Sequence, residues 1–303
     1  MRQPLCGTKT HSASIIAQTA GFFITFFKKD LLQKTSYLSA RIHILNRISD
    51  RKGVNAVKLI INGANGRMGK ILAEHIMKEN EHTVVGFVDP TLETKKEAAH
   101  YSRIFECSRK ADAIIDFSSH FAVPVLCSYA VKTKTPLVIA TTGHTEKERS
   151  IILSAAKRIP VFYSPNMSPG VSLTLCIAKI AAKTFPEAEI EIVEKHHSQK
   201  TDVPSGTALF LAEGLRSVRP ELFISTGRRN GGIRNRNELC IHSLRLGSSV
   251  GSHEIVFAMP GQTVTIRHEA HDRLLFVRGA LAAAEYITDK ECGIFCPENM
   301  IEK

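Results

Sequence analysis

The chain has 303 residues, of which 43% are hydrophobic and 23% are charged, and its formal net charge is +11. These values are typical of a globular protein with about two domains. No apolar run approaches the roughly 18 residues that a membrane-spanning helix needs, so we expect no membrane partner. The seven cysteines are scattered and odd in number, which indicates ordinary thiols in a reducing, cytoplasmic compartment rather than a disulfide framework.

The positive charge is concentrated at the N-terminal end of the chain. Residues 1–56 hold nine Lys or Arg and two acids, and so account for +7 of the total +11. Positive charge at one end of the chain does not indicate a basic binding groove on the folded domains. The chain also has no Trp and few Tyr on which bases could stack. We therefore expect no nucleic-acid partner.

Residues 1–56 are predicted to be a disordered basic extension without a catalytic role. The segment is poor in acids and includes the apolar run "SIIAQTAGFFITFF", which is typical of a targeting segment. A transit peptide would place the protein in an organelle. An over-extended gene start, with the true start near Val54 or Val57, and a genuine structural extension are the other two interpretations.

The stretch "AVKLIINGANGRMGKILAEHIM" predicts a buried strand, a glycine turn and a helix. Gly63, Gly66 and Gly69 have the spacing at which a backbone turn approaches a pyrophosphate at a helix N-terminus. The next predicted strand, "HTVVGFVD", ends at Asp89, where a carboxylate can accept hydrogen bonds from ribose hydroxyls. A loop acid that merely follows a strand is the alternative interpretation of Asp89.

The alternation of strands and helices continues to residue 168. Strands are predicted at 111–119, 136–143 and 159–168, and helices at 121–133 and 145–158, the second with Thr145 as N-cap and Glu148 three residues later. Small polar residues gather at the strand ends, at 116–118, 140–143 and 164–168. Because ligands bind at the carboxyl ends of parallel strands, residues 57–168 are predicted to form a Rossmann dinucleotide-binding domain.

The pattern changes after Pro169. Helices are predicted at 170–185 and 204–218, and alternating strands at 188–197, 239–246, 252–260 and 262–270. This order predicts an α/β protein whose second domain, 169–273, is an α+β unit with an open mixed sheet. Helices would cover one face of that sheet, and the other face would pair with another subunit. The helix predicted at 272–287 would return to the first domain, so that 274–303 completes it.

Six stretches together resemble one family: "GANGRMG", "DFS", "ATTG", "NMSPGV", "EKHHSQKTDVPSGTA" and "RLLFVRGALAAA". They resemble the 4-hydroxy-tetrahydrodipicolinate reductases, also called dihydrodipicolinate reductases, over residues 57–303. The resemblance implies NAD(P)H-dependent reduction of 4-hydroxy-tetrahydrodipicolinate to tetrahydrodipicolinate with loss of water, in diaminopimelate and lysine biosynthesis. It also implies a small dicarboxylate substrate and a homotetramer assembled through the C-terminal sheet.

The long "EKHHSQKTDVPSGTA" block carries the predicted substrate site. The resemblance implies His196 and Lys200 as catalytic proton donors, with His197 and Thr142 as substrate contacts. The Ser205, Gly206 and Thr207 backbone begins a helix and suits a substrate carboxylate. No metal ligand is predicted. The residues expected to bind NADH or NADPH are Gly63, Ala64, Asn65, Gly66, Arg67, Met68, Asp89, Phe117, Ala140, Thr141, Thr142, Ser164, Pro165, Asn166 and Met167.

The chain departs from the family pattern at several positions. Ser252 stands where the family usually has Glu, and Pro90 where some relatives carry an Arg suited to a 2′-phosphate. Arg67, Lys95 and Lys96 remain as possible phosphate partners.

Three alternatives stay open at this point. They are another two-domain dehydrogenase of the aspartate or homoserine type, a dinucleotide-sensing or nucleic-acid-binding protein, and a zinc site built from His196, His197 and a remote histidine.

Overall fold

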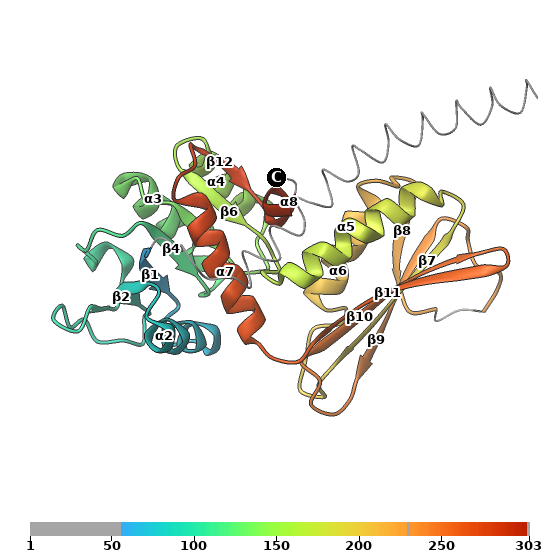
Figure 1. Cartoon of the computed structure of the whole chain (residues 1–303), viewed down its shortest axis with the longest axis horizontal. Helices are drawn as coiled ribbons and strands as arrows, with labels where there is room; N and C mark the ends of the chain where they lie inside the picture. The colour runs from blue at the N-terminus through green and yellow to red at the C-terminus, as the bar shows by residue number, and fades with distance from the viewer. Residues whose placement is uncertain (1–55, 229–230, 302–303) are drawn as a thin grey trace, which may run out of the picture. The chain divides into compact units, whose positions relative to one another are not determined.

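The computed structural model describes residues 56–228 and 231–301, which form two β-sheets and the helices that pack on them (Figure 1). Apart from Ala56, the segment predicted as an N-terminal extension lies outside these residues. Within the described part of the chain, none of the helices has the length and apolar character needed to cross a membrane.

The first sheet has seven parallel strands in the order β12-β6-β5-β4-β1-β2-β3. The run β3-β2-β1-β4-β5-β6 is the strand order of the dinucleotide-binding Rossmann fold. The strands are β1 (Lys58–Asn62), β2 (Thr83–Val88), β3 (His100–Tyr101), β4 (Ala113–Asp116), β5 (Leu137–Ile139), β6 (Pro160–Tyr163) and β12 (Gly293–Phe295).

Helices cover both faces of this sheet, which explains why its central strands are continuous apolar runs. Leu59 and Ile61 of β1 pack in a core with helices α2 (Arg67–Glu79) and α7 (Leu274–Ile287). Ile60 points into the other core, with helices α3 (Val123–Thr133) and α4 (Glu146–Ala156). The predicted cap of α4 is confirmed, because the Thr145 hydroxyl accepts from Glu148 N and Thr145 N donates to the Glu148 carboxylate.

The second sheet has five strands in the order β11-β10-β7-β9-β8. Its two halves differ in direction: β11, β10 and β7 are antiparallel neighbours, whereas β7, β9 and β8 run parallel. The strands are β7 (Glu189–His196), β8 (Phe223–Thr226), β9 (Glu238–Arg245), β10 (Gly251–Met259) and β11 (Gln262–Ala270). The predicted fold class, a Rossmann domain followed by an α+β domain with an open mixed sheet, is therefore confirmed.

Three short strands were not predicted. β3, β8 and β12 have two to four residues each and lie at sheet edges. Such segments are too short for an alternating pattern to stand out, and they are strands because a longer neighbour offers hydrogen bonds. The described chain then ends in the short helix α8 (Pro297–Ile301). Single-turn 3-10 helices cover Ile104–Glu106 and His120–Ala122.

Helices α5 (Pro169–Thr184) and α6 (Gly206–Arg216) pack on one face of the second sheet (Figure 1). Ile190 and Ile192 of β7 point to these helices and share a core with Leu211 of α6. Because side chains alternate along a strand, the residues between them point the other way. We call that side the outer face; it includes Glu191, Val193, Cys240, His242, Glu254 and Val256.

A fully buried carboxylate ties together three strand ends of the first sheet. Asp116 ends β4, and its Oδ1 accepts from Asn62 Nδ2 at 2.8 Å and from the Ser118 hydroxyl at 2.5 Å. Its Oδ2 accepts from the Thr141 hydroxyl at 2.6 Å. The ends of β1, β4 and β5 are therefore held in one network at the edge where a ligand is expected to bind.

We predict that Asp116→Asn lowers the free energy of unfolding by about 2 kcal/mol or more, because an amide N–H would face donors that now share a carboxylate. Chemical denaturation measures this change. Asp112→Asn is the matched control, because that exposed acid accepts one backbone bond, from Lys58 N, at the opposite end of the sheet. Equal stability of the two variants would show that the Asp116 network does not hold the strand ends.

Candidate functional site

The turn between β1 and α2 has the shape expected of a phosphate-binding loop. Gly63 N and Ala64 N both donate to Val88 O, at 2.8 and 3.1 Å, so the loop is folded against the end of β2. Gly63 has a φ of +81°, which favours glycine. A Cβ on Gly69 would lie 2.1 Å from Gly63 O, so only glycine allows the helix to approach the turn this closely.

The first turn of α2 leaves its backbone N–H groups available for an anion. The N-cap is Gly66, which has no side chain to bond to them. The loop is held beside them by Asn65, whose side-chain amide donates to the Thr91 hydroxyl at 2.7 Å. Arg67 is the first residue of the helix, and its side chain is exposed. This cradle fits the pyrophosphate of a dinucleotide.

Asp89 lies directly beside the glycine turn. Its carboxylate accepts from Asn65 N at 3.2 Å, from Thr91 N at 2.9 Å and from the Thr91 hydroxyl at 2.7 Å. The side chain is therefore fixed next to the loop that would hold the pyrophosphate. This is the position from which an acid reaches the ribose of a bound dinucleotide.

The other predicted cofactor residues lie at the ends of β4, β5 and β6. Ala140 N donates to Asp116 O, and Phe117 packs against the core that α2 and α7 share. Thr141 is buried, whereas the adjacent Thr142 is exposed.

The loop after β6 contacts helix α6, which packs on the second sheet, through Asn166. The Ser164 hydroxyl donates to Asn166 O at 2.6 Å and shapes the loop, in which Pro165 is exposed and Met167 buried. Asn166 Nδ2 then donates to the Thr207 hydroxyl of α6 at 2.7 Å. A predicted cofactor residue and a predicted substrate residue are thus in direct contact.

The end of β7 carries a buried imidazole–carboxylate pair. His196 Nδ1 lies 2.5 Å from Glu194 Oε2, and both side chains are buried. The two residues are two apart on one strand and so point to the same face. With Nδ1 engaged by the carboxylate, Nε2 is the nitrogen left for other chemistry. Gly251 leaves room for it, since a Cβ there would lie 2.9 Å from His196 Nε2.

Arg245 holds Glu194 from the neighbouring strand β9. Its guanidinium donates to both carboxylate oxygens, at 2.8 and 2.9 Å, and Ser205 N donates to Oε1 at 3.1 Å. Burial alone would raise the pKa of Glu194, but the bonds from His196, Arg245 and Ser205 N overcome it and hold that pKa well below its ordinary value. These bonds therefore favour the ionised carboxylate.

A second buried histidine completes this network. His253 of β10 lies opposite Glu194, and its Nε2 is 3.1 Å from the Ser205 hydroxyl. Its ring meets that of His196 edge to face, with centroids 5.2 Å apart. Burial, and then repulsion from His196, lowers the pKa of His253 to about 3, so this ring is neutral at ordinary pH.

The loop from His197 to Ser205 leads from the imidazole to the start of α6. His197 N donates to Ser249 O, and Lys200 N donates to His197 O. Lys200 Nζ donates to the exposed Asp202 carboxylate at 2.7 Å. Arg245 fixes the loop as well, because it also donates to Asp202 O at 2.7 Å.

The N-terminus of α6 provides an anion site next to this loop. The Ser205 hydroxyl caps the helix by accepting from Ala208 N at 3.2 Å. The N–H groups of Gly206 and Thr207 precede any acceptor within the helix, so they are available to a ligand. Gly206 is exposed, and a Cβ there would meet nothing within 4 Å. Loop and helix start together can bind a carboxylate beside a proton donor.

Sequence reasoning did not name Glu194, Arg245 or His253 as site residues. Glu194 could have been found, because its spacing of two from His196 places both on one face of a strand. Arg245 and His253 reach the site through strand register, which the sequence does not display. Ser252 is opposite Lys195 in the register and points to the outer face, away from His253. The unusual residue at 252 therefore lies outside this network.

Comparison with known proteins identifies relatives along almost the whole described chain. The family model described as dihydrodipicolinate reductase, N-terminus, matches residues 57–167, and that described as dihydrodipicolinate reductase, C-terminus, matches residues 170–301. The 4-hydroxy-tetrahydrodipicolinate reductase of Caldanaerobacter subterraneus is 41% identical over 249 residues, which is 82% of this chain and 99% of that protein. The corresponding protein of Clostridium novyi is 36% identical over 81% of this chain and 98% of its own length.

Solved structures show the same fold. A dipicolinate-bound dihydrodipicolinate reductase from Paenisporosarcina sp. TG-14 has a TM-score of 0.65 at 24% identity, covering 80% of this chain and 98% of that one. A probable dehydrogenase from Thermotoga maritima has a TM-score of 0.54 at 11% identity and covers 80% of this chain and 92% of its own. At these identities the likeness concerns the fold.

We predict that His253 makes the protein less stable in acid. Its pKa of about 3 in the folded state is below the ordinary value of about 6.5, so the unfolded chain binds one more proton between these values. Stability from this residue is fully present above about pH 6.5 and falls by about 1.4 kcal/mol per pH unit below it.

Denaturant unfolding between pH 7 and 5 measures this slope. His253→Gln keeps a polar atom near the position of Nε2 and should flatten the slope by about that amount. The exposed His271 provides the control variant His271→Gln, which should leave the slope unchanged. A slope unaffected by His253→Gln would mean that the buried ring does not stay neutral.

Proposed function

The chain belongs to the dihydrodipicolinate reductase family, and we propose that it reduces 4-hydroxy-tetrahydrodipicolinate to tetrahydrodipicolinate with loss of water. It is an oxidoreductase of diaminopimelate and lysine biosynthesis that uses a nicotinamide cofactor. The single observation that carries the proposal is the buried Glu194–His196 pair beside the Lys200 loop and the α6 N-terminus. The overall reaction consumes one hydride and one proton and releases the substrate hydroxyl as water.

The glycine turn and Asp89 would hold the dinucleotide. The N–H groups at the start of α2 would bind the pyrophosphate, and Asp89 would accept bonds from the adenine ribose. Residues at the ends of β4, β5 and β6 would line the nicotinamide end. When bound, the nicotinamide supplies the hydride.

The substrate is proposed to bind through its carboxylates. The free N–H groups of Gly206 and Thr207 would bind one carboxylate at the α6 N-terminus. Lys200 would turn from Asp202 to the substrate, because a short flexible pair at a loop is easily exchanged for another anion. His197 and Thr142 are proposed as further contacts. In this division, residues 57–168 with 274–303 bind the cofactor and contribute Thr142 to the substrate, and residues 169–273 supply the other substrate contacts.

His196 is proposed to move the proton. Glu194 engages Nδ1 and so directs Nε2 to the substrate, and it would balance the positive charge whenever the ring is protonated. Because Arg245 and Ser205 N hold the carboxylate, the ring is oriented before the substrate arrives. Lys200 is the second proposed proton donor, since an ammonium can both bind a carboxylate and give up a proton.

The assembly and location of the enzyme are part of the proposal. We place it in the cytoplasm, in keeping with the six free cysteines of the described chain. The outer face of the second sheet is proposed to form the contacts of a homotetramer. Partly buried Val193 and Val256 lie on that face among polar side chains.

We predict that Lys200→Ala lowers kcat/KM by about 10²–10⁴, the usual effect of losing a positioned acid–base group, with lost carboxylate binding added. His196→Gln should lower kcat and change KM less, because its proposed role is proton transfer. Neither change should weaken binding of the dinucleotide, whose proposed residues are on other elements. Steady-state kinetics and calorimetric titration with NADH measure the two effects.

Lys183→Ala is the control for loss of a lysine, because Lys183 is exposed in the last turn of α5. Near wild-type turnover in either site variant would show that the substituted residue has no role in catalysis. If both variants lose NADH affinity in step with activity, the loop belongs to the cofactor site instead.

We predict that NADH serves at least as well as NADPH. The Asp89 carboxylate next to the turn accepts bonds from ribose hydroxyls and repels a 2′-phosphate. Asp89→Ala should shift the ratio of kcat/KM values toward NADPH, with thermal unfolding measured to confirm that the loop still folds. A preference of about 100-fold for NADPH in the wild type would show that Arg67, Lys95 or Lys96 outweighs this repulsion.

A further inference from the structure

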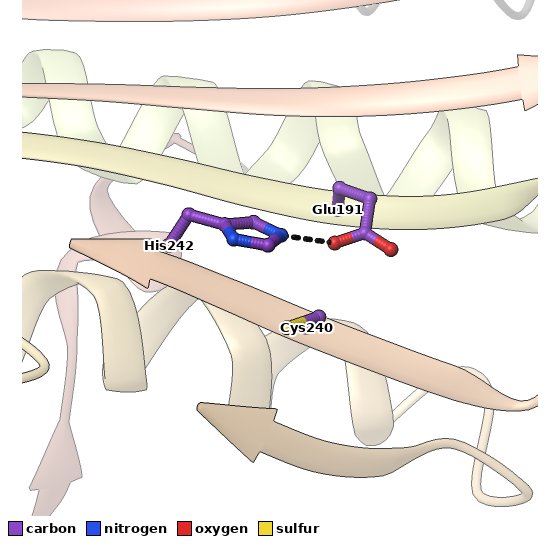
Figure 2. Close-up of side chains that lie close together, drawn as sticks. All are labelled: Glu191, Cys240 and His242. Atoms are coloured by element: carbon purple, nitrogen blue, oxygen red, sulfur yellow. Dashed lines mark hydrogen bonds and ion pairs between the residues drawn. The ribbon is translucent and has the colours of Figure 1, made fainter. Parts of the chain in front are cut away.

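A second group of potential ligands lies on the outer face of the second sheet, outside the site described above. Glu191, Cys240 and His242 each offer one atom, and these atoms all lie within 4.8 Å of one another. Figure 2 shows the imidazole of His242 directed at the Glu191 carboxylate, with the short side chain of Cys240 close to the ribbon of its own strand. His242 Nε2 is 2.8 Å from Glu191 Oε2.

The register of β7 and β9 produces this grouping. Glu191 is paired directly with Cys240 across the two parallel strands. His242 is two residues beyond Cys240, so its side chain emerges on the same face. The arrangement therefore rests on regular backbone pairing rather than on a flexible loop. Cys240 is fully buried, while Glu191 and His242 are partly exposed, so in the single chain an ion can reach the group from the outer face, which the proposed homotetramer would cover.

Arg234 orients the carboxylate and leaves one of its oxygens for another partner. Its Nε donates to Glu191 Oε1 at 2.9 Å, and the same guanidinium donates to Ile190 O and Glu238 O. Oε2 is directed at His242. Carboxylates that bind metals are commonly held in this way by a hydrogen bond to their other oxygen.

The Glu194 group on the opposite face provides a contrast. Glu194, His196 and His253 also lie within 4.8 Å of one another. There, however, Arg245 donates to both carboxylate oxygens and Ser205 N to one of them. Both oxygens of that carboxylate accept hydrogen bonds from other donors, whereas Glu191 Oε2 is bonded to a single imidazole nitrogen.

We propose that Glu191, Cys240 and His242 bind a divalent transition-metal ion of the zinc class. One thiolate, one imidazole and one carboxylate are a ligand set that suits Zn²⁺, whose bonds are about 2.3 Å to sulfur and about 2.0–2.2 Å to nitrogen or oxygen. Tetrahedral bonds of these lengths place ligand atoms about 3.3–3.6 Å apart. His242 Nε2 and Glu191 Oε2, now 2.8 Å apart, need to separate by about half an ångström, and Cys240 Sγ, which lies within 4.8 Å of both, needs to approach them by at most about 1.5 Å. A fourth position remains for water or for a group from a second copy of the chain.

Binding exchanges protons for the metal. The thiol of Cys240 releases its proton to solvent and binds as the thiolate. The neutral imidazole of His242 binds through Nε2 and carries its proton on Nδ1. No electron transfer is involved, because Zn²⁺ has no redox chemistry.

Cobalt provides a direct test on the full-length protein. After treatment with a chelator, the protein is titrated with Co²⁺ while the thiolate-to-cobalt charge-transfer absorption is followed, and Zn²⁺ is then added. We expect the band to saturate at one ion per chain and to disappear as Zn²⁺ replaces Co²⁺. Absence of a thiolate band in the wild type would overturn the proposal and leave the cluster as an ordinary ion-pair network.

Variants separate this site from adventitious binding. Cys240→Ala should abolish the band, and His242→Gln, at a partly exposed position, should weaken binding at least about 10-fold even if the cysteine variant folds poorly. Arg234→Gln should weaken binding by about 10–100-fold through the loss of its bond to Glu191. Cys292→Ala, which removes an exposed thiol, should leave the band intact. A band that persists in Cys240→Ala, or affinity unchanged in His242→Gln, would overturn the assignment.

Discussion

The buried carboxylate of Glu194 is the interaction on which the proposed substrate site depends. A charge without solvent is costly, and it persists only when enough donors surround it. Here the donors come from three places: the His196 ring on the same strand, the Arg245 guanidinium on the neighbouring strand, and Ser205 N at the start of α6. One carboxylate therefore fixes the strand end, the helix start and, through Arg245, the loop between them.

The first sheet uses the same device. Asp116 at the end of β4 is fully buried and accepts from side chains at the ends of β1 and β5. In both sheets the buried acid lies at the carboxyl end of a strand that has a parallel neighbour, where successive loops emerge side by side. Each buried charge needs hydrogen-bond donors from several of these loops, so the loops must lie close to one another. The residues proposed to bind cofactor and substrate are located on the loops that converge there, and Asn166 links the two groups by its bond to Thr207.

The parts of the site that could be predicted from sequence are those encoded locally. The glycine turn, Asp89 at a strand end and the capped start of α6 each depend on residues within one element and its flanks. The fold class followed from the alternation of strands and helices and then from the change of pattern after Pro169. Arg245 and His253 are different, because they are adjacent to Glu194 only through the pairing of β7 with β9 and β10. The edge strand β8 exists for a similar reason, since β9 offers it hydrogen bonds.

Glu191 and Glu194 show how the two faces of one strand acquire different chemistry. Three residues apart on β7, they point to opposite sides of the sheet, and each meets an arginine and a histidine. Arg245 donates to both oxygens of Glu194. The Glu194 carboxylate therefore serves to orient an imidazole. Arg234 bonds one oxygen of Glu191 and the backbone of two strands, so the other oxygen is left to His242. The two carboxylates therefore differ in how many oxygens a guanidinium occupies, and this difference is the basis for proposing a cation at Glu191 and not at Glu194.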